Sequence, residues 1–313
     1  LSIGTSEGFQ GAVLIRGGTL TLTTTDTQAG IGLGGTGYGG LFLSSGTINT
    51  KRVDSLDGTT TASIAVLQVS GGTLNTSNYI MFRNERWEFT VTGGQVLRTG
   101  DAIALGFRSG GSAGTATTTA QGAMTMAGGV VNNSIYNITF GQQNNNTALG
   151  TAYLNLNAGT LINNQIVHYN STGAAINSYV NFNGGTLQAS ANSLAFISVS
   201  GTGGTGTLTA YVNGAFGSYN GGAVINTSGY SVTIPIALNA PTGNGVASIA
   251  VTDGGSGYYG APYVEISGGG GSGATAFATV DLDPTSPTYG KLLSITISNP
   301  GVGYTSTPTV SLL

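Results

Sequence analysis

Residues 67–74, Leu-Gln-Val-Ser-Gly-Gly-Thr-Leu, contain the pattern that decides the fold. Leu67 and Val69 flank one polar residue, and this period of two is typical of a β-strand with one buried face. The pair Gly71-Gly72 permits positive φ and hence a sharp turn. Leu74 then begins another strand that faces the same core. The octapeptide therefore predicts a strand, a glycine corner and a second strand.

The same frame occurs in seven copies, and a degraded eighth copy follows. The corner pairs are Gly17-Gly18, Ser45-Gly46, Gly71-Gly72, Gly93-Gly94, Gly128-Gly129, Ala158-Gly159 and Gly184-Gly185, and the degraded copy keeps Gly221-Gly222 and Val224. No unit can bury its apolar side chains alone, so we expect the units to stack with each strand hydrogen-bonded to the next unit. The predicted fold class is all-β, with a parallel β-solenoid over residues 1–240.

Residues 241–313 contain a different duplication, with a period of 46 residues. Three segments recur: Ser248–Val251 as Ser294–Ile297, Gly257-Tyr258 as Gly303-Tyr304, and Pro262–Val264 as Pro308–Val310. The first copy continues through a glycine run into a predicted strand at Ala274–Val280, whereas the second copy stops at Leu313. We therefore expect a small duplicated β module after the solenoid. Its missing strand either was cut away or is supplied by something else.

Charged residues are scarce and unevenly placed. Eight Lys and Arg against eleven Asp and Glu give a formal net charge of −3, and 144 uncharged residues separate Arg108 from Asp253. So weak a charge does not favour nucleic acid or an anionic membrane as a partner. No apolar run reaches the roughly 18 residues of a membrane-spanning helix. Proton-transfer catalysis needs titratable groups, so the sequence predicts a protein that is not an enzyme.

The Gly-Gly-Thr-Leu units and the alternating strand before each of them resemble the autotransporter-associated (PATR-like) β-strand repeats of bacterial surface and secreted proteins. This resemblance covers residues 10–240. The C-terminal pair, with Gly-Ser-Gly-Tyr258 and Gly-Val-Gly-Tyr304 followed by Pro, is similar to a Gly-Tyr-Pro repeat of bacterial and phage extracellular proteins. These resemblances imply a right-handed β-helix that is exported and acts as a stalk, adhesin or filament. Because no transporter barrel is present, they do not imply an export route.

The densest polar cluster is residues 83–88, Arg-Asn-Glu-Arg-Trp-Glu. It is compatible with a glycan groove in which Trp87 is the stacking platform. Glu85 and Glu88 are candidates for the two carboxylates of a glycosidase, but in an extended strand they point to opposite faces. A local ion-pair network is the alternative, and we expect no catalytic residue here.

Several other polar residues suggest structural roles. Asp253, Glu265, Asp281 and Asp283 are weak calcium candidates, because calcium prefers oxygen ligands but the regular spacing of a calcium loop is missing. The only histidine, His168, has no nearby Cys or carboxylate and is expected to be a hydrogen-bonded strand residue. No cofactor is therefore expected, apart from the calcium alternative. Asn155, Asn157, Asn181 and Asn183 are expected to stack as polar ladders on the solenoid exterior.

The ends of a solenoid expose unpaired strand edges, which pair with another chain unless they are capped. We expect a structural subunit of an extracellular or cell-surface assembly that associates head-to-tail with itself as a homopolymer. A segment of one copy, residues 1–10, is expected to complete the C-terminal module of the next. The interface candidates are Leu1, Ile3, Phe9, Tyr258, Tyr259, Tyr304, Val310 and Leu312. An adhesin or tail protein that binds surface glycans is the second hypothesis, and a polysaccharide-cleaving β-helix enzyme is the third.

Overall fold

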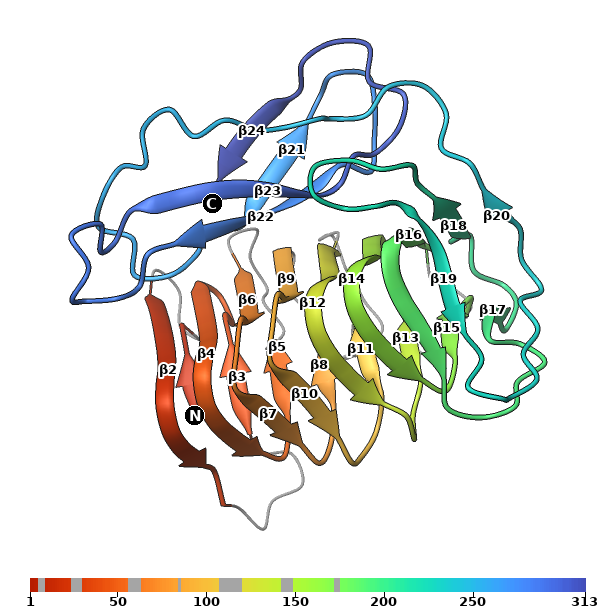
Figure 1. Cartoon of the computed structure of the whole chain (residues 1–313), viewed down its shortest axis with the longest axis horizontal. Helices are drawn as coiled ribbons and strands as arrows, with labels where there is room; N and C mark the ends of the chain where they lie inside the picture. Colours follow the sequence, from red (N-terminus) through yellow and green to blue (C-terminus); the bar gives the residue numbers. More distant parts are fainter. Residues whose placement is uncertain are drawn as a thin grey trace.

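The computed structural model describes residues 1–4, 9–23, 30–55, 63–83, 86–106, 120–141, 149–171 and 175–313. These residues form strands and connecting segments, and they contain no helix (Figure 1). Two large parallel sheets account for residues 1–240, and two small antiparallel sheets lie in residues 241–313. The all-β prediction is confirmed. We refer to residues 1–240 as the repeat region and to residues 241–313 as the C-terminal module.

The first large sheet has eight strands that follow one another in chain order, every neighbour parallel. Its strands are short, since each contributes only a few residues between the corners of a unit. They are β1 (Ser2–Ile3), β3 (Ile31–Leu33), β5 (Val53–Ser55), β8 (Ile80–Met81), β11 (Ile103–Leu105), β13 (Ile138–Phe140), β15 (Ile166–Tyr169) and β17 (Ile197–Ser200).

The second large sheet has twelve strands, also parallel, and the chain alternates between the two sheets. They are β2 (Gln10–Thr21), β4 (Tyr38–Thr50), β6 (Ile64–Val69), β7 (Thr73–Thr76), β9 (Arg86–Val91), β10 (Gln95–Arg98), β12 (Ala120–Asn133), β14 (Leu149–Asn163), β16 (Ala175–Ala189), β18 (Leu208–Val212), β19 (Gly222–Asn226) and β20 (Leu238–Asn239). β4 and β12 continue through the glycine corner, whereas the two units between them are divided there. The pairings β4–β6–β9–β12–β10–β7–β4 therefore close into a ring.

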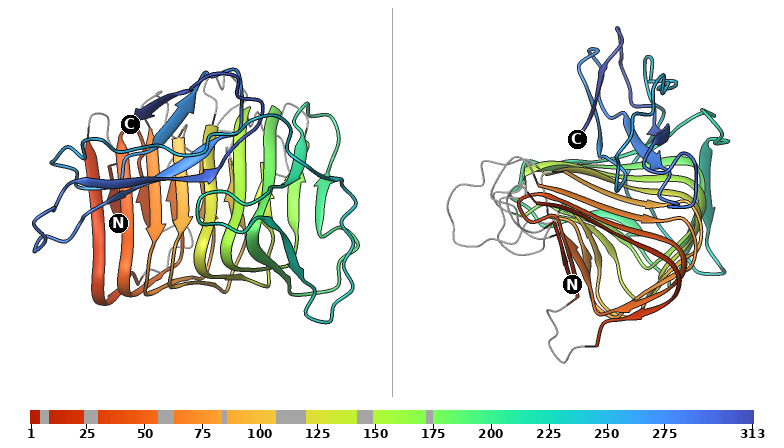
Figure 2. Two further views of the ribbon diagram at one scale, coloured as in Figure 1. Left: turned by 45° about the horizontal axis from the view of Figure 1, so that its top comes forward. Right: turned by 90° about the vertical axis from the view of Figure 1, so that its left-hand side faces the viewer.

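The repeated frames lie in register on neighbouring strands. The first apolar position forms one column across seven strands: Val13, Leu41, Leu67, Phe89, Met124, Leu154 and Val180. From Leu41 onward these side chains are buried in one continuous core that both sheets enclose. Figure 2 shows the successive units overlying one another. In the eighth copy, however, Leu187 pairs with Ile225 and Val224 is exposed, so the prediction for that copy was wrong by one residue.

The corner at Gly94 requires glycine for two reasons. Gly94 has a φ of 67°, a region that L-residues with a side chain rarely adopt. A Cβ on Gly94 would also lie 2.6 Å from the carbonyl oxygen of Gly72, the corner glycine of the unit before. The corner at Gly94 therefore excludes a side chain, because the corner of the preceding unit lies directly against it.

The C-terminal module pairs its strands in antiparallel fashion. β21 (Val264–Ser267) pairs with β24 (Thr309–Leu312), and β22 (Thr275–Val280) pairs with β23 (Leu292–Asn299). The duplicated segment Ser248–Val251 forms only an isolated antiparallel bridge, from Ile249 to Ile295, whereas its counterpart lies in β23.

The module lies against the outer face of the twelve-stranded sheet (Figure 2). A second apolar core forms there, in which Tyr38, Phe42 and Val66 of the sheet pack with side chains of the module. The Tyr38 hydroxyl donates a hydrogen bond to the carbonyl of Ala261 at 2.8 Å, and Gln68 Nε2 donates one to the carbonyl of Ala278 at 3.1 Å. The two parts of the chain are thus joined by apolar contact and by hydrogen bonds.

Candidate assembly surfaces

The end of the repeat region that carries the N-terminus is a row of strands paired on one side only. Among the described residues, β2 pairs only with β4 and β1 pairs only with β3. Val13 and Ile15 of β2 are half-buried, whereas Leu41 and Leu43, their neighbours in the next unit, are buried. Within the described residues, this end therefore has strands without a second neighbour, and half-buried apolar side chains lie at the margin of the core.

A cavity of about 350 Å³ lies beside this end, where the start of β2 meets the C-terminal module. We call it the tip cavity. Its lining includes Phe9, Tyr258, Tyr259, Leu312 and Leu313. Phe9 is 69% exposed and Tyr259 is 43% exposed, and the Tyr259 hydroxyl donates a hydrogen bond to Gln10 Oε1. Aromatic and aliphatic side chains from both ends of the chain thus surround one hollow.

The tip cavity brings together four of the predicted interface residues: Phe9, Tyr258, Tyr259 and Leu312. Leu1 is also exposed, and Val310 is half-buried in β24. Two further predictions need correction, because Ile3 is buried in the core of the repeat region and Tyr304 is buried in the C-terminal module.

The N-terminal residues are already paired within their own chain. The Leu1 amino group donates to the carbonyl of Gly30 at 2.9 Å, and the Leu1 carbonyl accepts from Gly32 N at 2.8 Å. Ser2–Ile3 form β1, and β2 begins at Gln10. The expectation that residues 1–10 are donated to another copy does not fit this pairing. Residues 5–8 lie outside the described residues.

Trp87 lies in the apolar core, not on a surface. Its side chain is fully buried and stacks on Phe82, with ring centroids 5.1 Å apart. In β9 the alternation of the strand directs Trp87 and Phe89 inward, so neither face of the indole is open to a glycan. The prediction of Trp87 as a glycan contact was wrong for this reason.

Glu88 points to the opposite face of β9 and lies beneath the C-terminal module. It is 3% exposed, and its Oε1 accepts hydrogen bonds from Gln68 Nε2 at 2.7 Å and from Thr90 Oγ1 at 2.9 Å. Within the described part of the chain, Oε2 has no partner. Burial raises the pKa of Glu88 to about 7, although both hydrogen bonds oppose this shift. The Glu88 carboxyl is therefore part of the contact between the twelve-stranded sheet and the C-terminal module.

The other charged residues of the cluster separate into different contacts. Arg86 pairs with Glu265 of the module at 2.6 Å, whereas Arg83 and Arg52 both contact the buried Asp54. Arg98 is buried, donates to Asn133 Oδ1 at 3.0 Å and to backbone carbonyls, and has its pKa lowered to about 9 by burial. Glu85 and Arg108 lie outside the described residues. Arg83 and Arg86 therefore form ion pairs with Asp54 and Glu265, which are not residues of the cluster, so these pairs differ from the local network that was predicted.

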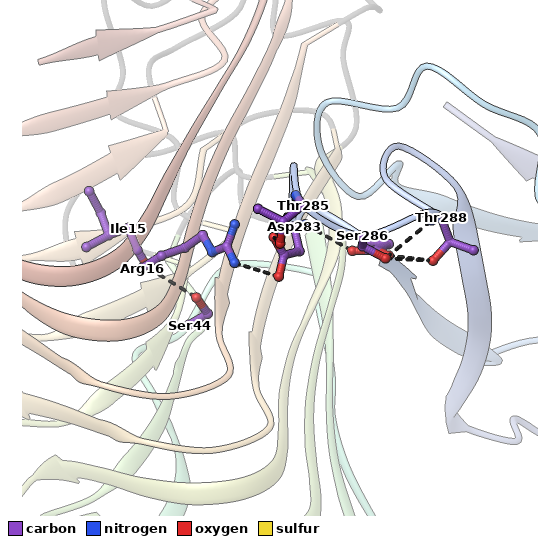
Figure 3. Close-up of polar contacts among 8 residues, drawn as sticks. Ile15, Arg16, Ser44, Asp283, Thr285, Ser286 and Thr288 are labelled. Carbon is purple, nitrogen blue, oxygen red and sulfur yellow. Dashed lines mark hydrogen bonds and ion pairs between the residues drawn. The ribbon is translucent and has the colours of Figure 1, made fainter.

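The weak calcium candidates are not gathered together. Glu265 is paired with Arg86, and Asp253 accepts a hydrogen bond from Gly255 N at 2.9 Å. Asp281 accepts from Thr288 Oγ1 at 2.6 Å, and Asp283 forms an ion pair with Arg16 of β2 at 2.7 Å (Figure 3). No group of three or more His, Asp or Glu side chains suited to a metal ion occurs among the described residues.

The turn around Asp283 is held mainly by its own residues. Thr285 donates to Asp283 Oδ1 through its backbone N–H at 2.9 Å and its hydroxyl at 2.7 Å. These bonds, with a smaller effect of Arg16, lower the pKa of Asp283 to about 2. The carboxylate is therefore charged over the physiological range, in the form that pairs with Arg16 of β2.

His168 is a buried strand residue, as predicted. Its Nδ1 lies 2.9 Å from Ser178 Oγ, and burial lowers its pKa to about 4. The predicted asparagine ladders are also present: Asn181 Nδ2 donates to Asn155 Oδ1 at 2.8 Å, and Asn183 Nδ2 donates to Asn157 Oδ1 at 2.7 Å. They lie on the outer face of the sheet but are covered by the module, where the Ser298 carbonyl accepts from Asn157 Nδ2 at 2.9 Å.

Comparison of the chain with protein-family models, with curated proteins and with solved structures finds no match. Within the described residues, no helix has the length and apolar character needed to span a membrane. The surfaces described above are therefore the basis for a functional interpretation.

Proposed function

We propose that this chain is a structural subunit of an extracellular bacterial filament or surface assembly, and that residues 1–240 form a right-handed β-solenoid. In-register parallel strands in two sheets, with one apolar column per repeat position, support the solenoid. The resemblance of the Gly-Gly-Thr-Leu units to repeats of bacterial surface proteins supports export. The proposed role is structural and does not involve proton-transfer catalysis.

The observation that carries the proposal is the one-sided pairing of β2. Among the residues that the structure describes, no strand pairs with the other side of β2, and a strand edge of this length is a template for another chain. The half-buried Val13 and Ile15 add apolar surface that a second copy would cover. The net charge of −3 is small, so electrostatic repulsion between copies does not prevent association at this end.

The opposite end of the repeat region offers a complementary surface. Val199, Val224 and Leu238 are exposed there, on β17, β19 and β20. A contact between β2 of one copy and this end of the next is heterologous, and such contacts build an open fibre when they do not close into a ring. Head-to-tail growth thus follows from two different ends.

Electron microscopy and sedimentation velocity over a range of concentrations test the proposal. We expect the unmodified chain to form linear polymers, and we expect Val13→Lys to raise the concentration needed for assembly by at least about tenfold, because a charge at an apolar contact opposes association. Thr305→Lys, at an exposed position of the module, is the matched control and should assemble normally. A monomeric unmodified chain, or normal polymers of a folded Val13→Lys variant, would refute the proposal.

The tip cavity favours glycan binding as a second candidate function. Phe9 and Tyr259 present exposed aromatic side chains beside a hollow of sugar size, and amphipathic aromatic rings are common at binding surfaces. A glycan array compares the unmodified chain with Tyr259→Ala and with Tyr289→Ala, an exposed tyrosine outside the cavity. Signals lost in the first variant alone would favour an adhesin.

A further inference from the structure

A second cavity, of about 320 Å³, lies between the outer face of the twelve-stranded sheet and β22 of the C-terminal module. We call it the lateral cleft. Its floor is formed by residues of β2, β4, β6 and β9 or of the positions just after them, and its roof by residues between 277 and 283. Because the floor spans four neighbouring strands, the cleft runs across the strands, in the direction in which the repeats stack (Figure 2). All its lining residues lie between Leu14 and Asp283, so neither end of the chain takes part in it.

The floor of the lateral cleft carries one hydroxyl in each of three successive repeat units. Ser44, Ser70 and Thr92 line the cleft, and all three side chains are exposed. Each directly follows a member of one paired row of the sheet, which consists of Leu43, Val69 and Val91. Neighbouring strands lie about 4.8 Å apart, so the hydroxyls recur at that interval along the cleft.

Two of these hydroxyls already use their protons within the protein. Ser44 Oγ donates to the carbonyl of Ile15 at 3.3 Å, and Ser70 Oγ donates to the carbonyl of Leu43 at 3.4 Å. A hydroxyl that donates one hydrogen bond still has two acceptor lone pairs. The row therefore offers acceptors to the cleft, and a fitting ligand has to bring donors that recur at the strand spacing.

The rest of the lining is electrically neutral and partly apolar. Within the described chain, the only charged lining residues are Arg16 and Asp283, which pair with each other at 2.7 Å beside Ser44 (Figure 3). A charged ligand would find no unpaired counter-charge there, and burying an unpaired charge is costly. Phe42 and Phe277 supply apolar surface, but a wholly apolar ligand would leave the hydroxyls without partners. The cleft therefore suits a neutral ligand with both hydroxyl groups and C–H surfaces.

We propose that the lateral cleft binds a linear neutral polysaccharide, which lies across the strands with one sugar residue per repeat unit. The length of one hexose in an extended glycan is close to the spacing of the strands, so successive sugar hydroxyls meet Ser44, Ser70 and Thr92 in turn. An extended peptide does not match this row, because it advances only about 3.3 Å per residue. The cavity volume lies at the lower end of the range for small-ligand sites, which suits a short oligosaccharide. The site is separate from the tip cavity, and it does not depend on filament formation.

Two residues of the floor provide the test variants. Ser70→Ala and Thr92→Val each remove one hydroxyl from an exposed position and change the local shape little, so both variants are expected to fold. Thr73→Val is the matched control. Thr73 lies on β7, beyond the glycine corner, and does not line the cleft.

Isothermal titration calorimetry measures the binding of cellotetraose, mannotetraose and maltotetraose to the whole chain, with tetragalacturonate as the charged probe. We expect at least one neutral tetrasaccharide to bind with a Kd below about 1 mM, and the corresponding disaccharide to bind at least about tenfold more weakly because it meets fewer hydroxyls. Ser70→Ala and Thr92→Val should each weaken binding about fivefold, whereas Thr73→Val should leave it unchanged.

Four results would overturn the proposal. They are no binding of any neutral tetrasaccharide to the folded chain at about 10 mM, equally tight binding of tetragalacturonate, equal effects of the three variants, and binding that is lost in Tyr259→Ala but kept in Thr92→Val. The last result would assign the glycan to the tip cavity. Polymers of the unmodified chain are scored separately, so this inference and the filament proposal fail independently.

Discussion

The repeat region and the C-terminal module are both built by repetition, but their copies are related by different operations. In the repeat region each unit is displaced along one direction, so that like residues form columns such as Val13–Leu41–Leu67. In the module, two copies are related by rotation, so that Ile249 meets Ile295. Translation places equivalent residues side by side on parallel strands, whereas rotation places them opposite each other on antiparallel strands. The relation between the copies therefore decides which kind of strand pairing holds them together.

The largest expected effect separates stacking from backbone strain within the repeat region. Gly94 and Gly18 have nearly the same positive φ, 67° and 64°, but a Cβ meets backbone atoms only at Gly94. We expect Gly18→Ala to lower the free energy of unfolding by about 1 kcal/mol, the cost of the left-handed conformation. Gly94→Ala should cost more than about 3 kcal/mol because the neighbouring corner must also move. Chemical denaturation measures both, and equal losses would contradict the stacking of the corners.

The second prediction concerns the contact between the two regions, where Glu88 is buried. Its pKa is raised in the folded chain, from 4.5 to about 7, so folding favours the protonated form. The contribution of Glu88 to stability should be largest below pH 4.5, fall as the pH rises from 4.5 to 7, and stay low above pH 7, whereas His168, whose pKa is lowered to about 4, contributes a change of opposite sign between pH 4 and 6.5. The difference is roughly 3 kcal/mol for this residue.

Glu88→Gln is the control for this pH dependence, because an amide of the same shape does not titrate. The variant should be more stable than the unmodified chain at pH 8, and this difference in stability between the two chains should shrink as the pH falls from 8 to 5, because the titration of His168 is common to both. Thermal unfolding at several pH values measures this. A pH profile that the substitution leaves unaltered would show that Glu88 is not the responsible group.

A smaller effect is expected where the asparagine ladder meets the module. Asn157 donates to the Ser298 carbonyl and accepts from Asn183, and it is buried. Asn157→Ala leaves both partners without these bonds and should lower stability by about 2 kcal/mol. Asn226→Ala, on the exposed strand β19, should cost less than about 0.5 kcal/mol. Similar losses in both variants would mean that the cover given by the module has no energetic role.

The smallest effect is expected at the Arg16–Asp283 ion pair, whose side chains are exposed. Exposed pairs contribute little and are screened by salt. Arg16→Ala should lower the melting temperature only slightly at low ionic strength and not at all in 1 M salt. A large loss that persists in salt would show that Arg16 holds the module by packing.

The stacking of the repeats was predictable because the pattern is local and recurs. Alternating apolar residues and a glycine pair define a strand and a corner in each unit, and the columns from Val13 to Val180 follow that frame. The eighth copy was misaligned by one residue, since only its glycines remained to set the frame. Side-chain alternation also explains Trp87: its neighbour Phe89 was in the apolar frame, so the indole two positions earlier had to point inward.

The docking of the module onto the sheet could not be predicted from the sequence. Outward positions of the repeats, such as Tyr38, Phe42 and Gln68, showed no periodic signal distinct from that of an exposed face. The burial of Glu88 and of the asparagine ladder therefore came from contacts between segments far apart in the sequence, with separations of 210 residues for Gln68–Ala278 and 141 for Asn157–Ser298. The period of 46 marked the two copies of the module, whereas their pairing, Ile249 with Ile295 and Glu265 with Ser311, came only from the structure.

The module touches the repeat region along much of its length. Arg16 of β2, Arg86 of β9 and Asn213 after β18 each bond to residues between 241 and 313. In a repeat array whose units contact only their neighbours, the terminal units unfold first, one at a time. Here the C-terminal module contacts repeat units that lie far apart, so that the first unit cannot unfold before the module detaches. Heat or mechanical pull should therefore open this chain in one cooperative event.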